Sequence, residues 1–151
     1  IKKNLINILI LLFFLSGCGY SPIFSNKNSN FSIYELSTSG NNKLNKIINS
    51  RLNNYKGSDG SKKISLIIET SVKKDIASRD SMGNPSTYSI NLNSNVSIKD
   101  SKGNLRKKLF SKSFNYNNNS NKLELKKYEN ETLKNLAVRI GEEIILYLQS
   151  M

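Results

Sequence analysis

The stretch YSINLNSNVSIKD, residues 88–100, alternates apolar and polar side chains more regularly than any other part of the chain. Its apolar residues all occupy even positions: Tyr88, Ile90, Leu92, Val96 and Ile98. Successive side chains of a strand point to opposite faces of a sheet, so this period of two predicts a half-buried strand. A sheet with one buried and one solvated face is therefore the expected framework of the fold.

Further strands are predicted on both sides of this stretch. The segment 64–72 shows the same period of two, and FSIYELST at 31–38 suits a first strand. DSKG at 100–103 has the composition of a hairpin turn, in which the glycine supplies the positive φ. The returning strand carries apolar residues of both parities, and we expect a β-bulge near 109–110, where the parity changes.

Two amphipathic helices complete the expected elements. Apolar residues recur at spacings of three and four from Asn41 to Tyr55, and again from Leu133 to Leu148. With the strands in between, both helices are able to cover the same face of the sheet. We predict an α+β fold: a two-layer sandwich with a four-stranded, mostly antiparallel sheet and two helices on one face, in the order β-α-β-β-β-α.

The composition is basic and poor in reactive side chains. The 151 residues include 23 Lys and Arg against 11 Asp and Glu, which gives a net charge of +12. Such a charge points to a polyanionic partner, although A+T-rich codons alone would also enrich Lys and Asn. One cysteine excludes an internal disulfide framework, and the lack of histidine removes the commonest metal ligand, so we expect no metal site.

The N-terminal segment has the layout of an export signal. Lys2 and Lys3 precede the apolar run 5–15, which is shorter than the roughly 20 residues that span a membrane. The sequence Leu-Ser-Gly-Cys at 15–18 resembles a bacterial lipobox. The resemblance implies cleavage after Gly17 and acylation of Cys18. We expect no cofactor besides this covalent lipid. Two or three acyl chains would anchor the protein stably in a membrane.

These boundaries define the expected domains. Residues 1–17 form the signal peptide, and residues 18–151 form a single domain, with a lipidated tether at 18–30 and a folded body at 31–151. Gly19 follows the modified cysteine, whereas an aspartate at that position usually marks retention in the inner membrane. We therefore expect the periplasmic face of the outer membrane to be the location.

Two segments resemble a known family. GCGYSPIF at 17–24 and SRDSMGNPSTYSINLNSNVSIKDSKG at 78–103 are similar to the start and the centre of the lipopolysaccharide-assembly lipoproteins, the LptE family. The resemblance implies a protein that plugs the outer-membrane β-barrel LptD, supports its assembly and binds lipopolysaccharide during transport to the outer leaflet. It implies no covalent chemistry, and we predict that the chain is not an enzyme.

The resemblance also directs attention to the turn between the third and fourth strands, where the family has a basic residue linked to lipopolysaccharide contact. An ordinary solvated hairpin end, with cations that discourage edge pairing, is an equally simple explanation of such a cluster. The candidate lipopolysaccharide-binding residues are Lys99, Lys102, Arg106, Lys107 and Lys108.

Other classes of function remain open from the sequence alone. One is a different outer-membrane lipoprotein that acts in envelope or barrel assembly. Another is a nucleic-acid-binding module, since Tyr88, Phe110, Phe114 and Tyr116 lie among basic residues on strands, but export argues against nucleic acid as a partner. For an enzyme, the acids on the last helix offer paired carboxylates, and we interpret them as a solvated helix face: Glu129, Glu131, Glu142 and Glu143.

Overall fold

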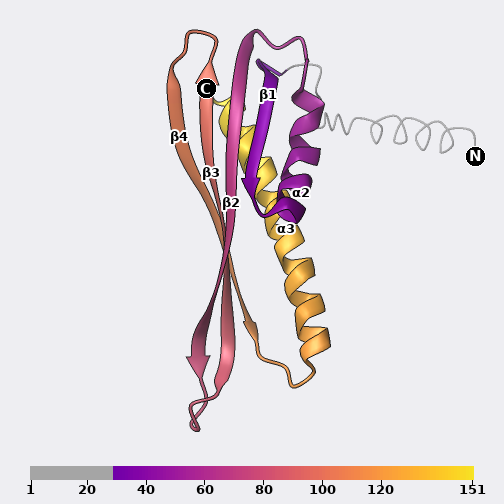
Figure 1. Cartoon of the computed structure of the whole chain (residues 1–151), viewed down its shortest axis with the longest axis vertical. Helices are drawn as coiled ribbons and strands as arrows, with labels where there is room; N and C mark the ends of the chain where they lie inside the picture. The colour runs from indigo at the N-terminus through magenta and orange to yellow at the C-terminus, as the bar shows by residue number, and fades with distance from the viewer. Residues whose placement is uncertain (1–28) are drawn as a thin grey trace, which may run out of the picture.

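Four strands form one mixed sheet in the order β1-β2-β3-β4, and two helices pack on one face of it (Figure 1). The computed structural model describes residues 29–151. β1 is parallel to β2, whereas β2–β3 and β3–β4 are antiparallel. The predicted α+β class and element order are confirmed. The elements are β1 (Phe31–Gly40), α2 (Asn42–Leu52), a 3-10 turn (Asn53–Tyr55), β2 (Lys62–Arg79), β3 (Pro85–Asp100), β4 (Leu105–Asn117) and α3 (Lys122–Gln149).

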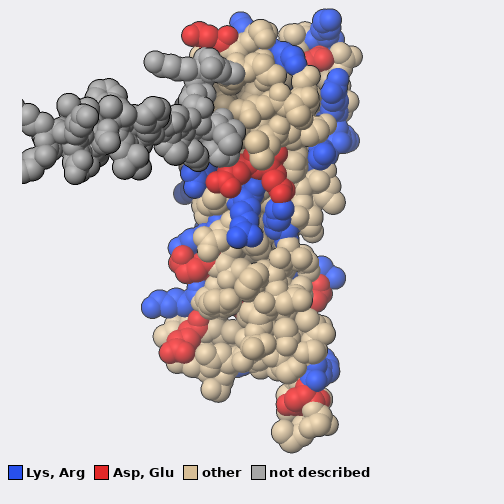
Figure 2. All heavy atoms as spheres, turned by 180° about the vertical axis from the view of Figure 1, so that it is seen from behind, with Lys and Arg blue, Asp and Glu red and all other residues tan. Residues whose placement is uncertain are grey.

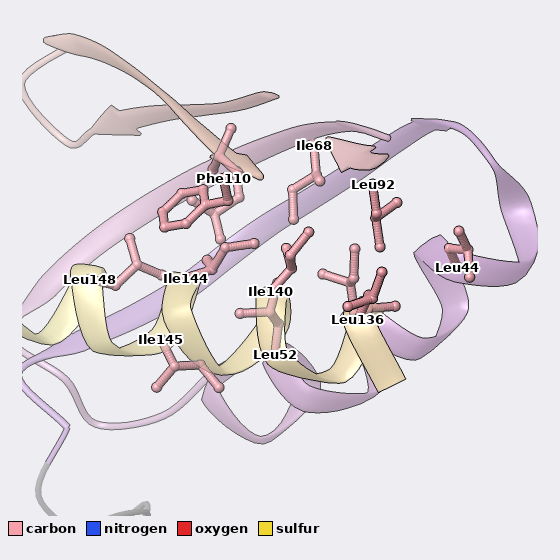
Figure 3. Packing of buried hydrophobic residues seen from close by; sticks show 14 of the residues in the cluster. Leu44, Leu52, Ile68, Leu92, Phe110, Leu136, Ile140, Ile144, Ile145 and Leu148 are labelled. Atoms are coloured by element: carbon pink, nitrogen blue, oxygen red, sulfur yellow. The ribbon is translucent and has the colours of Figure 1, made fainter. Parts of the chain in front are cut away.

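The even positions of β3 face the helices, as the alternation predicts. Ile90, Leu92, Val96 and Ile98 are all exposed by 2% or less. Figure 3 shows that Leu92 and Ile68 point from the sheet toward the side chains of α3. Full burial of each such side chain contributes about 1.5–3 kcal/mol, so this face supplies the main driving force for folding. The residues of α2 and α3 that reach this core include Leu44, Ile48, Leu52, Leu136, Ile140, Ile144 and Leu148.

Both helices begin at an asparagine cap and pack closely against each other. The Asn41 side chain accepts a hydrogen bond from the Leu44 N–H at 3.2 Å, and Asn121 caps α3 in the same way. A Cβ on Gly141 would lie 3.2 Å from side-chain carbons of Arg51, so this glycine lets α3 approach α2. No helix within residues 29–151 combines the length and apolar character needed to cross a membrane.

The predicted bulge near 109–110 is wrong. The register of β3 with β4 runs without a shift from the Thr87–Asn117 pair to the Lys99–Leu105 pair. β4 needs no bulge to bring all its apolar residues to one face, because Leu105 and Leu109 stay on the solvent face, each 57% exposed. The register shifts instead occur in β1 after Ile33 and in β2 after Ile76.

β2 is longer than the predicted 64–72, and its second half extends past the end of β1. The two strands pair only as far as Gly40 and Thr70, after which the chain turns into α2. β2 continues to Arg79 beside β3 alone. The sheet therefore has one end covered by both helices and another covered by α3 alone (Figure 1).

Candidate anion-binding site

Three of the five predicted cations come together around the β3–β4 turn. Lys102 lies at the apex of the turn, Lys99 at the end of β3 and Arg106 at the start of β4. Two cations that the sequence analysis missed join them, because the pairing of Ile64 with Asp100 brings the start of β2 alongside the turn. We call this group the basic end: Lys62, Lys63, Lys99, Lys102 and Arg106.

The basic end borders a hollow on each face of the sheet. On the helix face, Lys62, Lys102 and Arg106 line a hollow of about 410 Å³ together with the apolar side chains Ile64, Ile98 and Met151. On the opposite face, Lys63, Lys99 and Lys102 line a second hollow with Tyr34. Each hollow thus combines ammonium or guanidinium groups with apolar surface, which suits an amphiphilic anion.

Lys107 and Lys108 do not belong to this arrangement. They line a different hollow, which they share with Glu69. Lys108 lies on the helix face of β4, with its Nζ 4.3 Å from the centre of the Tyr147 ring. Through this cation–π contact the ammonium group of Lys108 packs against α3, so it is engaged within the protein.

A single carboxylate within the turn holds its shape. Asp100 Oδ1 accepts hydrogen bonds from the backbone N–H groups of Lys102 and Asn104, both at 2.9 Å, and Oδ2 accepts from the Asn104 side chain at 2.8 Å. The bond from the Asn104 side chain is the largest cause of the lowered pKa of Asp100. This acid therefore fixes the backbone that presents Lys102.

The β2–β3 turn has the same construction as this turn. There Asp80 Oδ1 accepts from Met82 N–H at 2.9 Å and from Asn84 N–H at 2.8 Å. Gly83 and Gly103 have φ values of 84° and 88°. The repeated motif Asp-Ser-x-Gly-Asn at 80–84 and 100–104 was a sequence signal for this likeness, and the sequence analysis missed it.

The two turns lie at opposite ends of β3 and differ at their apex. β3 has 16 residues, so at about 3.3 Å per residue the turns are about 50 Å apart. One apex carries Lys102, and the other carries Met82, which is 82% exposed. On the face shown in Figure 2, Lys and Arg gather along the upper part of the molecule, while most of the lower part is uncharged.

The described chain begins at the basic end. The Asn30 side chain donates to the Gln149 carbonyl at 2.9 Å, and Lys62 N–H donates to the Asn30 carbonyl at 3.1 Å. These bonds tie the entry of β1 to the end of α3 and the start of β2. Cys18 and most of the predicted tether lie outside the described residues. The first described residues of the chain therefore lie beside the basic end.

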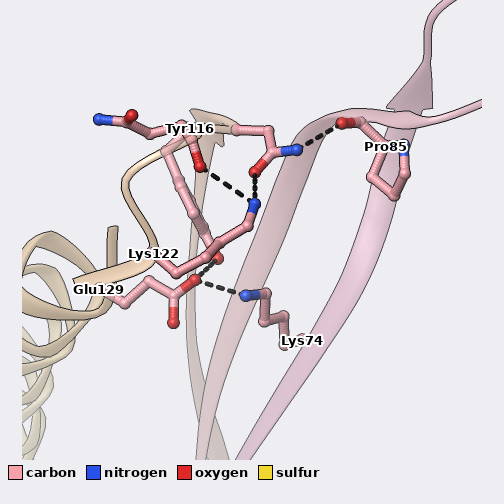
Figure 4. Close-up of polar contacts among 7 residues, drawn as sticks. Lys74, Pro85, Tyr116, Lys122 and Glu129 are labelled. Atoms are coloured by element: carbon pink, nitrogen blue, oxygen red, sulfur yellow. Dashed lines mark hydrogen bonds and ion pairs between the residues drawn. The ribbon is translucent and has the colours of Figure 1, made fainter. Parts of the chain in front are cut away.

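Two of the acids on α3 are not simply solvated, contrary to the sequence interpretation: Glu143 pairs with Lys112 of β4, and Glu129 is the more buried of the two. Glu129 forms an ion pair with Lys74 of β2 and accepts a hydrogen bond of 2.6 Å from the Tyr116 hydroxyl of β4 (Figure 4). Its side chain is only 18% exposed. Nearby, Lys122 at the start of α3 donates to the Asn118 side chain at 2.9 Å. These bonds fasten the first turns of α3 to the sheet.

The protonation of this group follows from its contacts. Burial, followed by the neighbouring Glu129, raises the pKa of Tyr116 to about 12, so its hydroxyl keeps its proton at physiological pH. Partial burial by itself would raise the pKa of Glu129, but hydrogen bonds from Lys74 and Tyr116 outweigh it and lower the pKa overall. Glu129 and Lys74 are therefore charged and Tyr116 is neutral, and the three side chains bond to one another in a network that stabilises the fold.

Replacing Glu129 by glutamine should lower the free energy of unfolding by about 1 kcal/mol at pH 7, since Lys74 is partly exposed and the pair is screened by solvent. The folded pKa of Glu129 is depressed, so its contribution is present above its unfolded pKa and is lost as the pH falls through the folded value. Urea unfolding at pH 7 and in acid should show the difference from wild type shrinking in acid.

Glu131→Gln is the matched control, because Glu131 pairs with Lys134 at a site where its side chain is 65% exposed. It should change stability by less than about 0.5 kcal/mol at either pH. Equal losses for the two variants would contradict a special role for Glu129.

Solved structures of bacterial lipoproteins share this fold. The chain is similar to rare lipoprotein B from Shewanella oneidensis, with a TM-score of 0.63 and 20% identity over 79% of this chain and 95% of that chain. A minor lipoprotein from Acinetobacter baumannii has a TM-score of 0.58 and 12% identity, over 82% of this chain and 92% of that chain. Lipoprotein B from Nitrosomonas europaea has a TM-score of 0.58 and 11% identity, over 87% and 91%.

At these identities the likeness shows the fold alone. No model of a known protein family matches the chain, and a search of curated proteins gives no match. The fold is thus one that bacterial lipoproteins adopt.

Proposed function

We propose that this protein is an outer-membrane lipoprotein of the LptE type, which binds lipopolysaccharide at its basic end and supports assembly of an LptD-like β-barrel. The observation that carries the proposal is the position of the basic end next to Asn30, where the predicted tether meets the body. A lipid anchor on Cys18 would hold this end of the molecule toward the membrane. The structural likeness to lipoproteins supports the anchor.

The chemistry of the basic end suits lipopolysaccharide. Lipid A and core sugars carry phosphate groups, which lysine and arginine bind through charge-assisted hydrogen bonds. Ile64, Ile98 and Met151 add apolar surface beside Lys102 and Arg106. A ligand with phosphates next to acyl chains would contact the cations through its phosphates and the apolar side chains through its acyl chains. Binding and positioning of this kind need no catalytic group, and we propose none.

The lipid anchor is tested directly by replacing Cys18 with alanine. Cells fed a tagged fatty acid should label the wild-type protein, and the variant should take up no label, because no other thiol exists in the chain. The wild-type protein should also fractionate with the outer membrane, since two or three acyl chains give stable anchoring. A bare Cys18 thiol on an uncleaved chain, found by mass spectrometry, would remove the basis of the proposal.

The proposed barrel partner is tested by purification from detergent-solubilised outer membrane. The full-length protein should bring down one large β-barrel protein, and purified lipopolysaccharide should bind the pair. Recovery of a different envelope complex would favour another role in envelope or barrel assembly. Recovery of bound nucleic acid would favour a nucleic-acid-binding module, although Phe110 and Tyr116 are buried under α3 and offer no open stacking surface.

A further inference from the structure

α2 and α3 border a hollow that lies outside the basic end. Its volume is about 460 Å³, and it lies between the first two turns of α2 and the part of α3 from Lys127 to Lys134. Leu44, which is buried, and the half-buried side chains of Ile47 and Leu133 give it an apolar lining. We call this hollow the interhelix groove.

Four exposed lysines line the same groove. Lys43 and Lys46 come from α2, and Lys127 and Lys134 come from α3. Lys134 is paired with Glu131, which also lines the groove, whereas the other three lysines form no ion pair within residues 29–151. Four lysines against one glutamate leave the groove with a net charge of +3. Apolar side chains within a polar rim are the usual composition of a protein–protein interface.

We propose that the interhelix groove binds an acidic segment of a partner protein. The segment carries at least two Asp or Glu residues, which pair with Lys43, Lys46 and Lys127. An apolar side chain between these acids packs on Ile47 and Leu133. Complementary charge of this kind selects the partner and speeds its association, and the apolar contact adds affinity. The proposal goes beyond the proposed function, and it holds whether or not lipopolysaccharide binds at the basic end.

Residues 1–28 of the chain do not have the charge that this groove requires. They contain three lysines and no Asp or Glu. In the groove they would add positive charge beside Lys43, Lys46 and Lys127, and like charges repel. The occupant is therefore a segment from outside this part of the chain.

A second copy of the chain is also a poor occupant. All 11 acids of the chain lie within residues 29–151, and six of them are engaged, four in ion pairs and two in the β-turns. The other five are spread over β1, the loop before β2, β2 and both halves of α3, and no two of them are neighbours in sequence: Glu35, Asp59, Glu69, Glu124 and Glu142. Two copies also repel each other through a net charge of +12 each.

Lipopolysaccharide suits this groove less well than a protein segment does. Leu133 precedes Gln149 along α3, and at 1.5 Å per residue the groove lies about 24 Å from the end of the helix at the basic end. A ligand held in a membrane beside the basic end would not reach it. Glu131 within the groove would also repel a ligand that is dense in phosphates.

The test uses the full-length protein in the cells that make it. A photoreactive amino acid replaces Asn130, an exposed residue that lines the groove, and the linked residue is mapped by mass spectrometry. The expected product contains one partner protein, linked within a segment that carries at least two Asp or Glu residues. The matched control is the same probe at Asn135, which is exposed on α3 but does not line the groove, and it should give no link to that segment.

Charge reversal tests whether the lysines hold this segment. Lys43→Asp with Lys46→Asp should reduce the product at Asn130 by at least tenfold, because each replacement turns an attraction into a repulsion. Lys102→Asp with Arg106→Asp makes the same change in net charge at the basic end and should leave the yield within about twofold. Replacing the acids of the linked segment by lysine should restore the product with the Lys43→Asp, Lys46→Asp protein and reduce it with wild type.

Several outcomes would overturn the proposal. These are the absence of a product at Asn130, a link to a second copy of the chain, to residues 1–28 or to lipopolysaccharide, and a linked segment without acids. Equal loss of product in both double variants would show a response to net charge alone, and failure of the reversed segment to restore the product would show that the lysines do not contact its acids. Binding of purified lipopolysaccharide to the basic end is measured separately, so its failure is distinct from each of these.

Discussion

Gly40→Ala should lower the free energy of unfolding by about 3 kcal/mol. Gly40 has φ +88°, a left-handed conformation that costs other residues about 1–2 kcal/mol. A Cβ at this position would also lie 2.0 Å from the carbonyl oxygen of Thr70, which belongs to the backbone of β2. Either the last pair of the β1–β2 ladder breaks, or the entry to α2 shifts. Urea unfolding followed by circular dichroism measures the loss.

Gly103→Ala is the matched control, because it separates the two causes. Gly103 has the same φ of +88°, but nothing lies within 4 Å of the position that a Cβ would take there. This variant should lose only the conformational part, about 1–2 kcal/mol. If both variants lose the same amount, the contact with Thr70 does not constrain the fold, and the abrupt end of β1 has another cause.

The elements were predictable wherever the side chains repeat with a clear period. The strand around Leu92 and the helix around Ile140 each bury one regular face, and local sequence carries that information. The second half of β2 lacks such a pattern, because α2 does not cover it and no apolar alternation is needed there. The bulge was predicted wrongly for a different reason: Leu105 and Leu109 are apolar but stay in solvent, so the change of parity does not mark a change of the buried face.

The candidate site was predictable only in its local part. Lys99, Lys102 and Arg106 are close in sequence, so one turn brings them together. Lys62 and Lys63 join them through the pairing of β2 with β3, which is set by the register of the whole hairpin. Glu129 and Lys74 are 55 residues apart, and neither local segment indicates that they meet. Long-range pairing therefore decides which charges stay free to bind a ligand.

Lys102→Asp combined with Arg106→Asp should weaken binding of purified lipopolysaccharide by at least tenfold. Each replacement removes an attraction to phosphate and adds a repulsion, and each term is worth about 1 kcal/mol at 4 Å in water. Tenfold weaker binding corresponds to about 1.4 kcal/mol, so partial screening still leaves a measurable loss. Binding of the wild-type protein should fall as the salt concentration rises. The measurement is a titration with labelled lipopolysaccharide at two salt concentrations.

Two controls decide whether position or total charge is responsible. Lys43→Asp with Lys46→Asp makes the same change in net charge on the exposed surface of α2 and should leave binding within about twofold. Lys102→Met gives the turn the apex residue of its counterpart at Met82, on a backbone that both turns share, and should weaken binding without loss of stability. Equal losses from the α2 and turn variants would mean that lipopolysaccharide responds only to net charge, and the basic end would then be ordinary solvated surface.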